Sequence, residues 1–219
     1  MRLTLVRHGQ TPSNVRRLLD TGAPGPGLTD LGREQARAVP AALGQESVDG
    51  LFASNLVRTQ HTAAPLARER DLPVEIDPRL REISAGSLEM RGDDAAVRTY
   101  LETVYAWVSG DLQARMPSGP DGAETLGRFD EAVDRMLRAG LRSPVVFSHG
   151  AIIRAWSTAR AANVAPDFIT ANPLSNTGIV VLEHGGSGWE LLTWMGEAVG
   201  GRTLQDAGED GPAAEGLAS

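Results

Sequence analysis

Two short apolar runs, each ending in a His-Gly pair, constrain this chain more than any other feature. The first is Leu3-Thr4-Leu5-Val6 before Arg7-His8-Gly9, and the second is Pro144-Val145-Val146-Phe147-Ser148 before His149-Gly150. Short runs of this kind, rich in β-branched residues, predict buried strands. Because each run leads into a helix-like segment, we expect parallel strands that both carry a histidine at the carboxyl end. Ligands of open α/β sheets bind at that edge.

Strand and helix patterns alternate between the two runs. After a strand over 2–7 and a Gly- and Pro-rich loop over 10–27, Thr29 is expected to cap a helix that ends near Leu43. A strand over 51–53, a helix capped by Ser54 and an edge strand over 74–76 follow. Residues 79–92 are expected to be irregular.

The second half continues the same alternation. Helices are expected over 93–108, from Thr125 to Gly140 and over 151–162, with a hairpin that pairs 178–182 with 189–194. The expected fold class is α/β, a single-domain three-layer α/β/α arrangement with a mostly parallel central sheet. We expect a catalytic domain over 1–199, in which 93–121 covers the substrate, and an acidic, flexible tail over 200–219.

Composition narrows the classes of partner. The formal net charge of −7 argues against a nucleic-acid surface, which needs a basic face. The chain has no cysteine, and its four histidines lack metal-ligand spacing, so neither a metal nor another cofactor is expected. No apolar stretch is long enough for a signal-peptide core or a membrane span, so we expect a cytoplasmic protein that does not bind membranes.

Basic and imidazole side chains collect at the predicted strand ends. Arg7 and His8 follow the first strand, Arg58 lies one turn into the helix after 51–53, and His149 follows the later strand. In a parallel sheet these groups meet in one crevice and form an anion site. Guanidinium groups bind phosphate bidentately, and a neutral imidazole can attack phosphorus. The pattern therefore predicts phosphoryl chemistry with one of the two histidines as nucleophile.

These residues belong to a longer ordered series that resembles the histidine phosphatase superfamily, in the branch that contains cofactor-dependent phosphoglycerate mutases and their phosphatase relatives. The resemblance covers about residues 2 to 182 and implies a phosphoglycerate mutase-like fold. Its motifs are Arg7-His8-Gly9 with Thr11 and Asn14, Leu28-Thr29-Asp30-Leu31-Gly32-Arg33-Glu34-Gln35-Ala36, Ser54-Asn55-Leu56-Val57-Arg58-Thr59-Gln60-His61-Thr62-Ala63, Leu80-Arg81-Glu82, Gly122-Ala123-Glu124-Thr125, and Ser148-His149-Gly150 with Ile153-Arg154.

The resemblance also implies roles for individual residues. His8 becomes phosphorylated, and Glu82 acts as general acid and then as the base that activates water. The phosphate-binding residues are Arg7, Arg58, His149, Asn14, Thr11 and Gln10. The sequence departs from the family pattern at two places. Many members carry an acidic residue where Gln10 stands. Many also carry an aromatic residue before the glutamate and a glycine after it, where this chain has Leu88 and Met90 on either side of Glu89.

Three functions remain open at this stage. The favoured one is a phosphomonoesterase of the histidine acid phosphatase type that hydrolyses a small phosphorylated metabolite. The alternative is a phosphoglycerate mutase, although the segment after Glu82 differs from the longer mutase pattern and the tail lacks lysine. A noncatalytic phospholigand-binding protein is the third.

Other aromatic and histidine residues are expected to matter less for the chemistry. His61 and His184 are expected outside the site, and Tyr100, Tyr105, Trp107 and Met116 fall in the segment expected to select the substrate. Relatives are commonly dimeric, so a homodimer is a further expectation. Trp156, Trp189 and Trp194 fit either an interface or the core.

Overall fold

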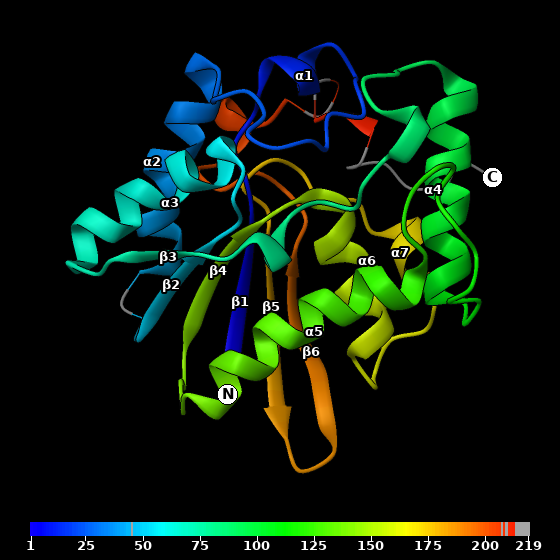
Figure 1. Cartoon of the computed structure of the whole chain (residues 1–219). Coiled ribbons are helices and arrows are strands. Elements are labelled where there is room, and N and C mark those ends of the chain that lie inside the picture. The colour runs from blue at the N-terminus through cyan, green and yellow to red at the C-terminus, as the bar shows by residue number, and fades with distance from the viewer. Residues whose placement is uncertain (45, 207, 209, 213–219) are drawn as a thin grey trace.

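The central sheet has six strands in the order β3-β2-β4-β1-β5-β6 (Figure 1). The computed structural model describes residues 1–44, 46–206, 208 and 210–212. The strands are β1 (Arg2–Arg7), β2 (Gly50–Ala53), β3 (Val74–Ile76), β4 (Pro144–Ser148), β5 (Ile179–Gly185) and β6 (Gly188–Met195). Strands β1 to β4 run parallel, β5 pairs antiparallel with β1, and β6 pairs antiparallel with β5. The predicted mostly parallel sheet and its hairpin are confirmed.

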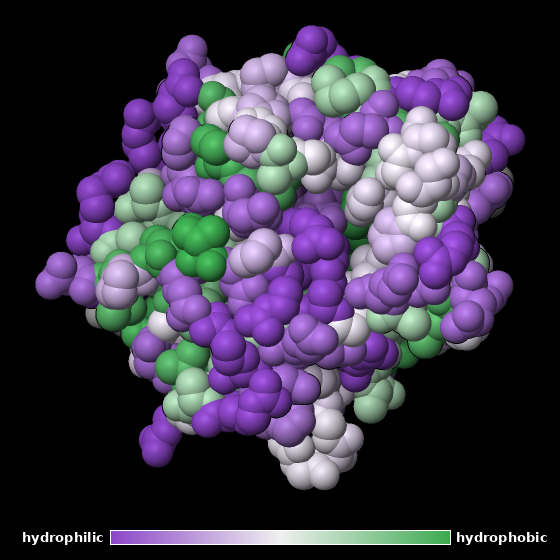
Figure 2. All heavy atoms as spheres, in the orientation of Figure 1, coloured by the Kyte–Doolittle hydropathy of each residue, from purple (hydrophilic) through white to green (hydrophobic). Residues whose placement is uncertain are grey.

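Helices cover both faces of this sheet, which gives the predicted three layers in one domain. They are α1 (Pro12–Val15), α2 (Asp30–Leu43), α3 (Val57–Arg70), α4 (Asp94–Val108), α5 (Gly122–Arg138), α6 (Gly150–Arg160) and α7 (Phe168–Ala171), with short 3-10 turns η1 (Pro78–Leu80), η2 (Gly86–Leu88) and η3 (Arg202–Leu204). Within the described part of the chain, no helix combines the length and the apolar character needed to span a bilayer. Figure 2 shows hydrophilic atoms over much of the visible face, with hydrophobic atoms in small separate groups.

Alternating strand residues supply two separate apolar cores. Leu3 and Leu5 of β1 join a cluster with α4, α5 and α6, whereas Val6 joins a cluster with α2 and α3. On β4, Val146 faces the first cluster and Phe147 the second. Successive strand side chains point to opposite faces, so a strand covered on both sides reads as a continuous apolar run. This is why the two opening runs lack polar alternation.

Two predicted helix starts are wrong. Ser54 does not cap α3, which begins at Val57, and its hydroxyl instead accepts the N–H of Leu56 at 3.2 Å. Thr125 lies inside α5, because Asp121 and Glu124 form a capping box that starts this helix at Gly122. Thr29 caps α2 as predicted, accepting the N–H of Gly32 at 3.0 Å. The expected loop over 10–27 also contains the short helix α1.

The tryptophans divide between core and rim. Trp156 on α6 and Trp189 on β6 are buried, and their ring centroids lie 5.5 Å apart. Trp194 is only half-buried and packs against Phe168, with centroids 5.0 Å apart. Core packing therefore accounts for Trp156 and Trp189.

The register of the parallel strands places the functional residues. Arg7 pairs with Ser148, and Ala53 pairs with Phe147. The residues after β1, β2 and β4 consequently leave the sheet at the same edge, and α1 lies above that edge in Figure 1. His8, Ser54 and His149 each come directly after one of these strands.

A close backbone approach explains the glycine after His8 and its partner in α2. A Cβ added to Gly32 would lie 2.1 Å from the carbonyl oxygen of Gln10, and one added to Gly9 would lie 2.6 Å from the carbonyl oxygen of Gly32. Both contacts are with backbone atoms, which cannot move aside as a flexible side chain can. The start of α2 thus packs directly on the loop that carries His8.

We expect Gly32→Ala to lower the free energy of unfolding by about 1–3 kcal/mol, because the added methyl group overlaps the Gln10 carbonyl. The matched control is Gly127→Ala within α5, where an added Cβ meets nothing within 4 Å. That change removes a flexible residue from a helix interior and should stabilise the protein by about 0.5–1 kcal/mol. Urea unfolding of both variants measures the difference. Equal effects of the two substitutions would contradict the close approach.

Candidate active site

His8 lies at the carboxyl end of β1 with its backbone held on several sides. Its N–H donates to the Ser148 carbonyl at 3.0 Å, and its carbonyl accepts from the Asn176 side chain at 3.0 Å. The ring Nδ1 lies 2.8 Å from the Gly9 carbonyl oxygen. A carbonyl oxygen only accepts, so Nδ1 carries the proton in this contact and Nε2 keeps its lone pair. The local geometry thus leaves Nε2 as the nucleophilic nitrogen.

His149 lies beside His8, with ring centroids 5.2 Å apart in a T-shaped arrangement. Its Nδ1 accepts from Arg58 Nε at 3.3 Å, and its Nε2 lies 2.8 Å from the Ser54 hydroxyl. Since Arg58 can only donate, Nδ1 is unprotonated and Nε2 carries the proton toward Ser54. His149 is therefore a neutral ring that connects Arg58 to the end of β2.

Both imidazoles are biased strongly toward the neutral form. Burial lowers the pKa of His8 well below its ordinary value, and the positive charges of Arg58 and Arg7 lower it further. The pKa of His149 is lowered well below the ordinary value for the same reasons, first burial and then Arg58. A neutral ring beside two cations is the state in which a histidine can attack an electrophile.

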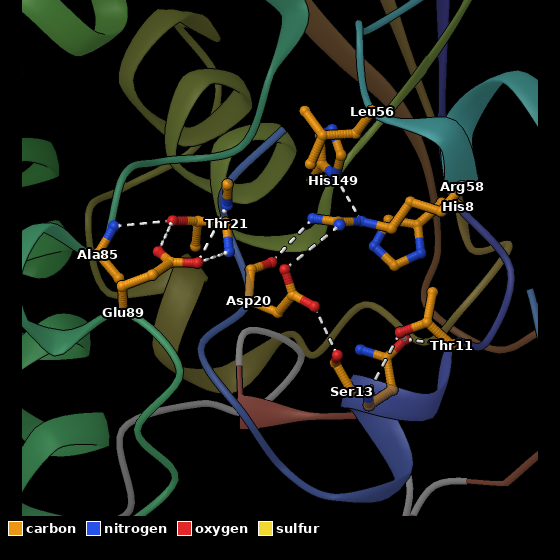
Figure 3. Close-up of polar contacts among 12 residues, drawn as sticks. His8, Thr11, Ser13, Asp20, Thr21, Leu56, Arg58, Ala85, Glu89 and His149 are labelled. Atoms are coloured by element: carbon orange, nitrogen blue, oxygen red, sulfur yellow. Dashed lines mark hydrogen bonds and ion pairs between the residues drawn. The ribbon is translucent and has the colours of Figure 1, made fainter. Parts of the chain in front are cut away.

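Arg58 is almost fully buried on the first turn of α3. Its Nη2 donates to the Asp20 carbonyl at 2.9 Å, and its Nη1 lies 3.9 Å from Asp20 Oδ1 (Figure 3). Nη1 has no hydrogen-bond partner among the described residues. A buried guanidinium with an unused donor is costly unless a ligand completes its hydrogen bonds.

Arg7 is buried just as deeply. Its Nη1 donates to the Leu174 carbonyl at 2.6 Å, and its Nη2 donates to the Asp210 carbonyl. Nε has no partner among the described residues. Burial lowers the pKa of both Arg7 and Arg58, but a guanidinium remains charged throughout the ordinary pH range. The edge of the sheet thus presents two fixed positive charges with donors to spare.

Glu82 joins this edge from the irregular segment before η2. Its Oε1 accepts the N–H groups of Ile83 at 2.8 Å and Ile152 at 2.9 Å, and its Oε2 accepts that of Ala151 at 3.1 Å. The carboxyl group therefore sits on the N-terminus of α6, one turn from His149. Oε2 makes one of these bonds and Oε1 makes two, which leaves Oε2 freer to carry a proton.

The segment that carries Glu82 is anchored by neighbouring elements. Arg128 of α5 donates to the carbonyls of Arg79 at 2.5 Å and Glu82 at 2.8 Å, and burial lowers its pKa to about 10. Ser148 donates to the Leu80 carbonyl at 2.7 Å. These contacts fix an irregular segment against β4 and α5.

One cavity brings most of the predicted residues together. It is lined by Arg7, His8, Thr11, Ser13, Asn14, Leu18, Leu19, Asp20, Thr21, Arg58, Glu82, Tyr100 and Pro212. His149 lies outside this lining and contacts Arg58 instead. The described residues contain no cluster of three or more His, Cys, Asp or Glu side chains able to hold a metal ion.

The three predicted polar residues after His8 have different surroundings. Thr11 and Asn14 form the capping box of α1 and line the cavity. Gln10 does not reach the cavity, because its side chain accepts from Thr29 at 2.8 Å and donates to Asp206 at 3.3 Å. The structure therefore brings Thr11 and Asn14 to the site and turns Gln10 toward α2.

Part of the expected tail contacts this site. Besides the Asp210 carbonyl on Arg7, the Asp210 carboxylate accepts the N–H of Asn176 at 2.9 Å, and Gln35 donates to the Leu204 carbonyl at 2.8 Å. Asp210 is consequently buried. Residues 207, 209 and 213–219 of the expected flexible tail lie outside the described residues.

Several contributing residues were not identified from sequence. Asp20 and Thr21 line the cavity, and Ser54 and Asn176 hold the two histidines. Tyr100, which falls in the segment expected to select the substrate, also lines the cavity and is buried, with its hydroxyl donating to the Ile83 carbonyl at 3.1 Å. Asp20 sits in a Gly- and Pro-rich region whose path the sequence pattern does not determine. His61 is exposed, as expected for a residue outside the site.

Comparison with a family model decides the identity. Residues 3–196 match the histidine phosphatase superfamily, branch 1. The chain belongs to this superfamily. The match runs from β1 to the end of β6 and thus covers every strand of the sheet.

Named relatives of this histidine phosphatase fall on both sides of the phosphatase and mutase division. The chain is 37% identical over 137 residues to an adenosylcobalamin/alpha-ribazole phosphatase of Escherichia coli, an alignment that covers 63% of this chain and 65% of that protein. It is 31% identical over 209 residues to a probable phosphoglycerate mutase GpmB of Erwinia tasmaniensis, covering 91% of this chain and 93% of that one.

One relative is much longer than this chain. An alignment at 37% identity covers 94% of this chain but only 38% of a PE-PGRS family protein of Mycobacterium tuberculosis.

Among solved structures, a mycobacterial glucosyl-3-phosphoglycerate phosphatase in complex with VO3 matches with a TM-score of 0.74 and 27% identity. That match covers 90% of this chain and 99% of the other.

The buried neutral histidines predict a specific pH dependence of stability. An unfolded histidine takes up a proton near pH 6.5, whereas folded His8 does so only at a lower pH, so stability is lost as the pH falls below about 6.5. Each such histidine contributes up to about 1.4 kcal/mol per pH unit in that window. His8→Gln should therefore show a shallower loss of unfolding free energy between pH 6.5 and 5 than the unsubstituted protein.

The matched control is His61→Gln at an exposed position on α3. It should retain the slope of the unsubstituted protein when denaturant unfolding is repeated across the same pH range. If His8→Gln and His61→Gln gave the same slope, His8 would not be held neutral by burial.

Proposed function

We propose that this histidine phosphatase is a phosphomonoesterase that forms a phosphohistidine on His8. The observation that carries the proposal is the convergence of two buried guanidiniums, each with an unused donor, on a neutral imidazole in one cavity. A phosphoryl group fits these donors in charge and geometry. The role of each residue is part of the proposal.

The first step transfers the phosphoryl group to the enzyme. The Nε2 lone pair of His8 attacks phosphorus, while Arg7 and Arg58 bind the nonbridging oxygens and stabilise the charge that develops on them. The bond from phosphorus to the ester oxygen breaks, and Glu82 supplies the proton that this oxygen needs to leave as an alcohol. The N–H of Gly9 donates to Thr62 at 3.0 Å, which helps to hold the His8 loop against α3 during this step.

The second step reverses the role of Glu82. Its carboxylate, held at the N-terminus of α6, takes a proton from a water molecule as the water oxygen attacks phosphorus. The bond between phosphorus and Nε2 breaks, which releases phosphate and restores neutral His8. Glu82 is then protonated again for the next ester.

The remaining predicted residues have supporting roles in this proposal. Thr11 and Asn14 line the cavity, and Thr11 donates its hydroxyl proton to Asn14 Oδ1 at 2.9 Å, which leaves the Asn14 amide N–H groups as the donors for a phosphate oxygen. His149 holds Arg58 in place through its Nδ1, which accepts from Arg58 Nε at 3.3 Å. Residues 93–121 contribute Tyr100 to the cavity lining, which supports a substrate-covering role for that segment.

The acid phosphatase type is a finer proposal that the electrostatics support. Because the pKa of His8 is lowered well below its ordinary value, this nucleophile stays neutral in mildly acidic solution. We also propose a cytoplasmic location and a homodimer. Leu192 and Met195 on the edge strand β6 are exposed, and a second copy of the chain would cover them.

Phosphoglycerate mutase activity is the second candidate, and the resemblance to GpmB favours it. A mutase uses the same phosphohistidine but passes the group to a second substrate hydroxyl instead of to water. The resemblance to an alpha-ribazole phosphatase and to a glucosyl-3-phosphoglycerate phosphatase supports hydrolysis. The two activities differ only in the acceptor.

Replacing Glu82 tests its proposed role through the leaving group. Glu82→Gln should reduce kcat/KM for an alkyl phosphate by about 10²–10⁴-fold, because an alkoxide cannot depart without a proton. The same variant should lose far less activity toward 2,4-dinitrophenyl phosphate, whose leaving group needs no proton. An equal loss on both substrates, measured by phosphate release, would assign Glu82 a structural role only.

Product analysis separates the two candidate activities. With 3-phosphoglycerate, in the presence and absence of 2,3-bisphosphoglycerate, the protein should release phosphate and make little 2-phosphoglycerate. Rapid formation of 2-phosphoglycerate with little free phosphate would establish the mutase instead. Phosphate release from phenyl phosphate no greater than that of His8→Ala would leave only phospholigand binding.

A further inference from the structure

Asp20 is the acidic residue of the cavity that the proposed mechanism does not use. It lies between His8 and Thr21 in the cavity lining, and its side chain is 12% exposed. Figure 3 shows its carboxylate facing Arg58 on one side and Ser13 on the other. An aspartate that faces a phosphate site requires an explanation, because its charge opposes the ligand.

The surroundings of Asp20 hold it firmly. Ser13 donates to its Oδ2 at 2.5 Å, and its carbonyl accepts from Arg58 at 2.9 Å. The following residues are fixed by Glu89, whose carboxylate accepts the N–H groups of Thr21 at 2.7 Å and Gly22 at 3.0 Å. The Asp20 carboxylate therefore has a defined position, because moving it away from a bound ligand would break its hydrogen bond with Ser13.

The cavity has little unpaired positive charge with which a second anionic group on the substrate could interact. Among the described residues that line it, the cations are Arg7 and Arg58, and the carboxylates are Asp20 and Glu82. With His8 neutral, these four charges cancel when Glu82 is ionised and sum to +1 when it is protonated. A phosphate monoester uses the open donors of both guanidiniums. A second negative charge on the alcohol would then have no cation in the lining to pair with.

The rest of the lining suits an uncharged alcohol. Leu18 and Leu19 supply apolar surface. The hydroxyl groups of Ser13, Thr21 and Tyr100 donate their protons to Asp20, Glu89 and the Ile83 carbonyl, so they offer a substrate acceptor oxygens. Asp20 itself is an acceptor for a hydroxyl or ammonium group on the substrate. The features of this part of the cavity are thus apolar contact, neutral polar groups and one fixed negative charge.

We propose that Asp20 is a specificity-determining residue, which selects phosphate monoesters of neutral or cationic hydroxyl-bearing alcohols and disfavours esters that carry a carboxylate close to the phosphate. The inference rests on the proposed phosphomonoesterase function and adds its substrate class. Like charges facing each other inside a cavity repel strongly because solvent screens them poorly. The discrimination follows from that repulsion together with the lack of a further cation.

The test uses two esters that share a carbon skeleton, glycerol 3-phosphate and 3-phosphoglycerate. The unsubstituted protein should favour glycerol 3-phosphate by at least about tenfold in kcat/KM. Asp20→Asn keeps the shape and the contact with Ser13 but removes the charge, so the ratio should fall by about tenfold through a gain on 3-phosphoglycerate. The matched control, Asp134→Asn on the exposed face of α5, removes one charge from the surface and should leave the ratio as it was.

Two results overturn the proposal. One is a wild-type ratio near one or below, and the other is an Asp20→Asn variant that changes both substrates by the same factor, as a purely structural partner of Arg58 would. Phenyl phosphate serves as the check on the proposed function, since it lacks a second charge. If it is not hydrolysed, phosphomonoesterase activity fails.

Binding then tests Asp20 independently. Calorimetric titration of both esters into His8→Asn, and into the same variant with Asp20→Asn, measures charge selection without turnover. Weaker binding of 3-phosphoglycerate that is relieved by Asp20→Asn supports the proposal, and equal affinities contradict it.

Discussion

The burial of two guanidinium groups is the constraint on which the rest of this site depends. Removing a cation from water is costly, and Arg7 and Arg58 recover only part of that cost from protein groups. Arg7 uses two carbonyls, whereas Arg58 uses the Asp20 carbonyl and the His149 ring. One nitrogen of each has no hydrogen-bond partner among the described residues, and in the proposed mechanism the phosphoryl group supplies it.

The same two charges set the state of the neighbouring imidazoles. A protonated His8 would add a third positive charge to a buried site, and burial alone already disfavours the charged ring. Backbone contacts then decide which nitrogen is free, because the Gly9 carbonyl takes the Nδ1 proton. In the proposed mechanism one arrangement therefore serves two purposes, since the cations that bind the phosphoryl group also keep His8, its proposed acceptor, unprotonated.

Glu82 couples the irregular segment after β3 to the second half of the sheet. Its carboxylate accepts two backbone N–H groups at the start of α6, the helix that follows His149. Arg128 and Ser148 hold the same segment through its carbonyls. The proposed proton donor thus lies on a segment without regular structure, and its position depends on contacts with the start of α6, with α5 and with the end of β4.

The sequence predicted the parts of this molecule that follow from local pattern. The apolar runs before His8 and His149, the cap at Thr29 and the hairpin over 179–195 all depend on neighbouring residues, and the structure confirms them. The start of α5 was predicted incorrectly although Asp121 and Glu124 form a recognisable capping box. Ser54 was read as a cap, but tertiary contact with His149 decides its role.

Residues brought to the site by long-range contacts had no local signal. Asn176 reaches His8 across 168 positions, and Asp210 reaches Arg7 across 203. Asp20 faces Arg58 from a loop whose next two residues donate to Glu89, 68 and 67 positions away. Such contacts depend on how distant segments pack, which periodicity and spacing do not encode.

The most direct test of the account is to locate the phosphoryl group on the enzyme during turnover. The protein is mixed with a ³²P-labelled monoester, and the reaction is quenched in base to preserve phosphohistidine. One sample is digested and analysed by mass spectrometry. A second sample is left intact and analysed by ³¹P NMR. The account predicts an acid-labile phosphoryl group on Nε2 of His8, formed and consumed at rates that match turnover. Turnover without a phosphoenzyme, or label on His149 or another residue, would contradict it.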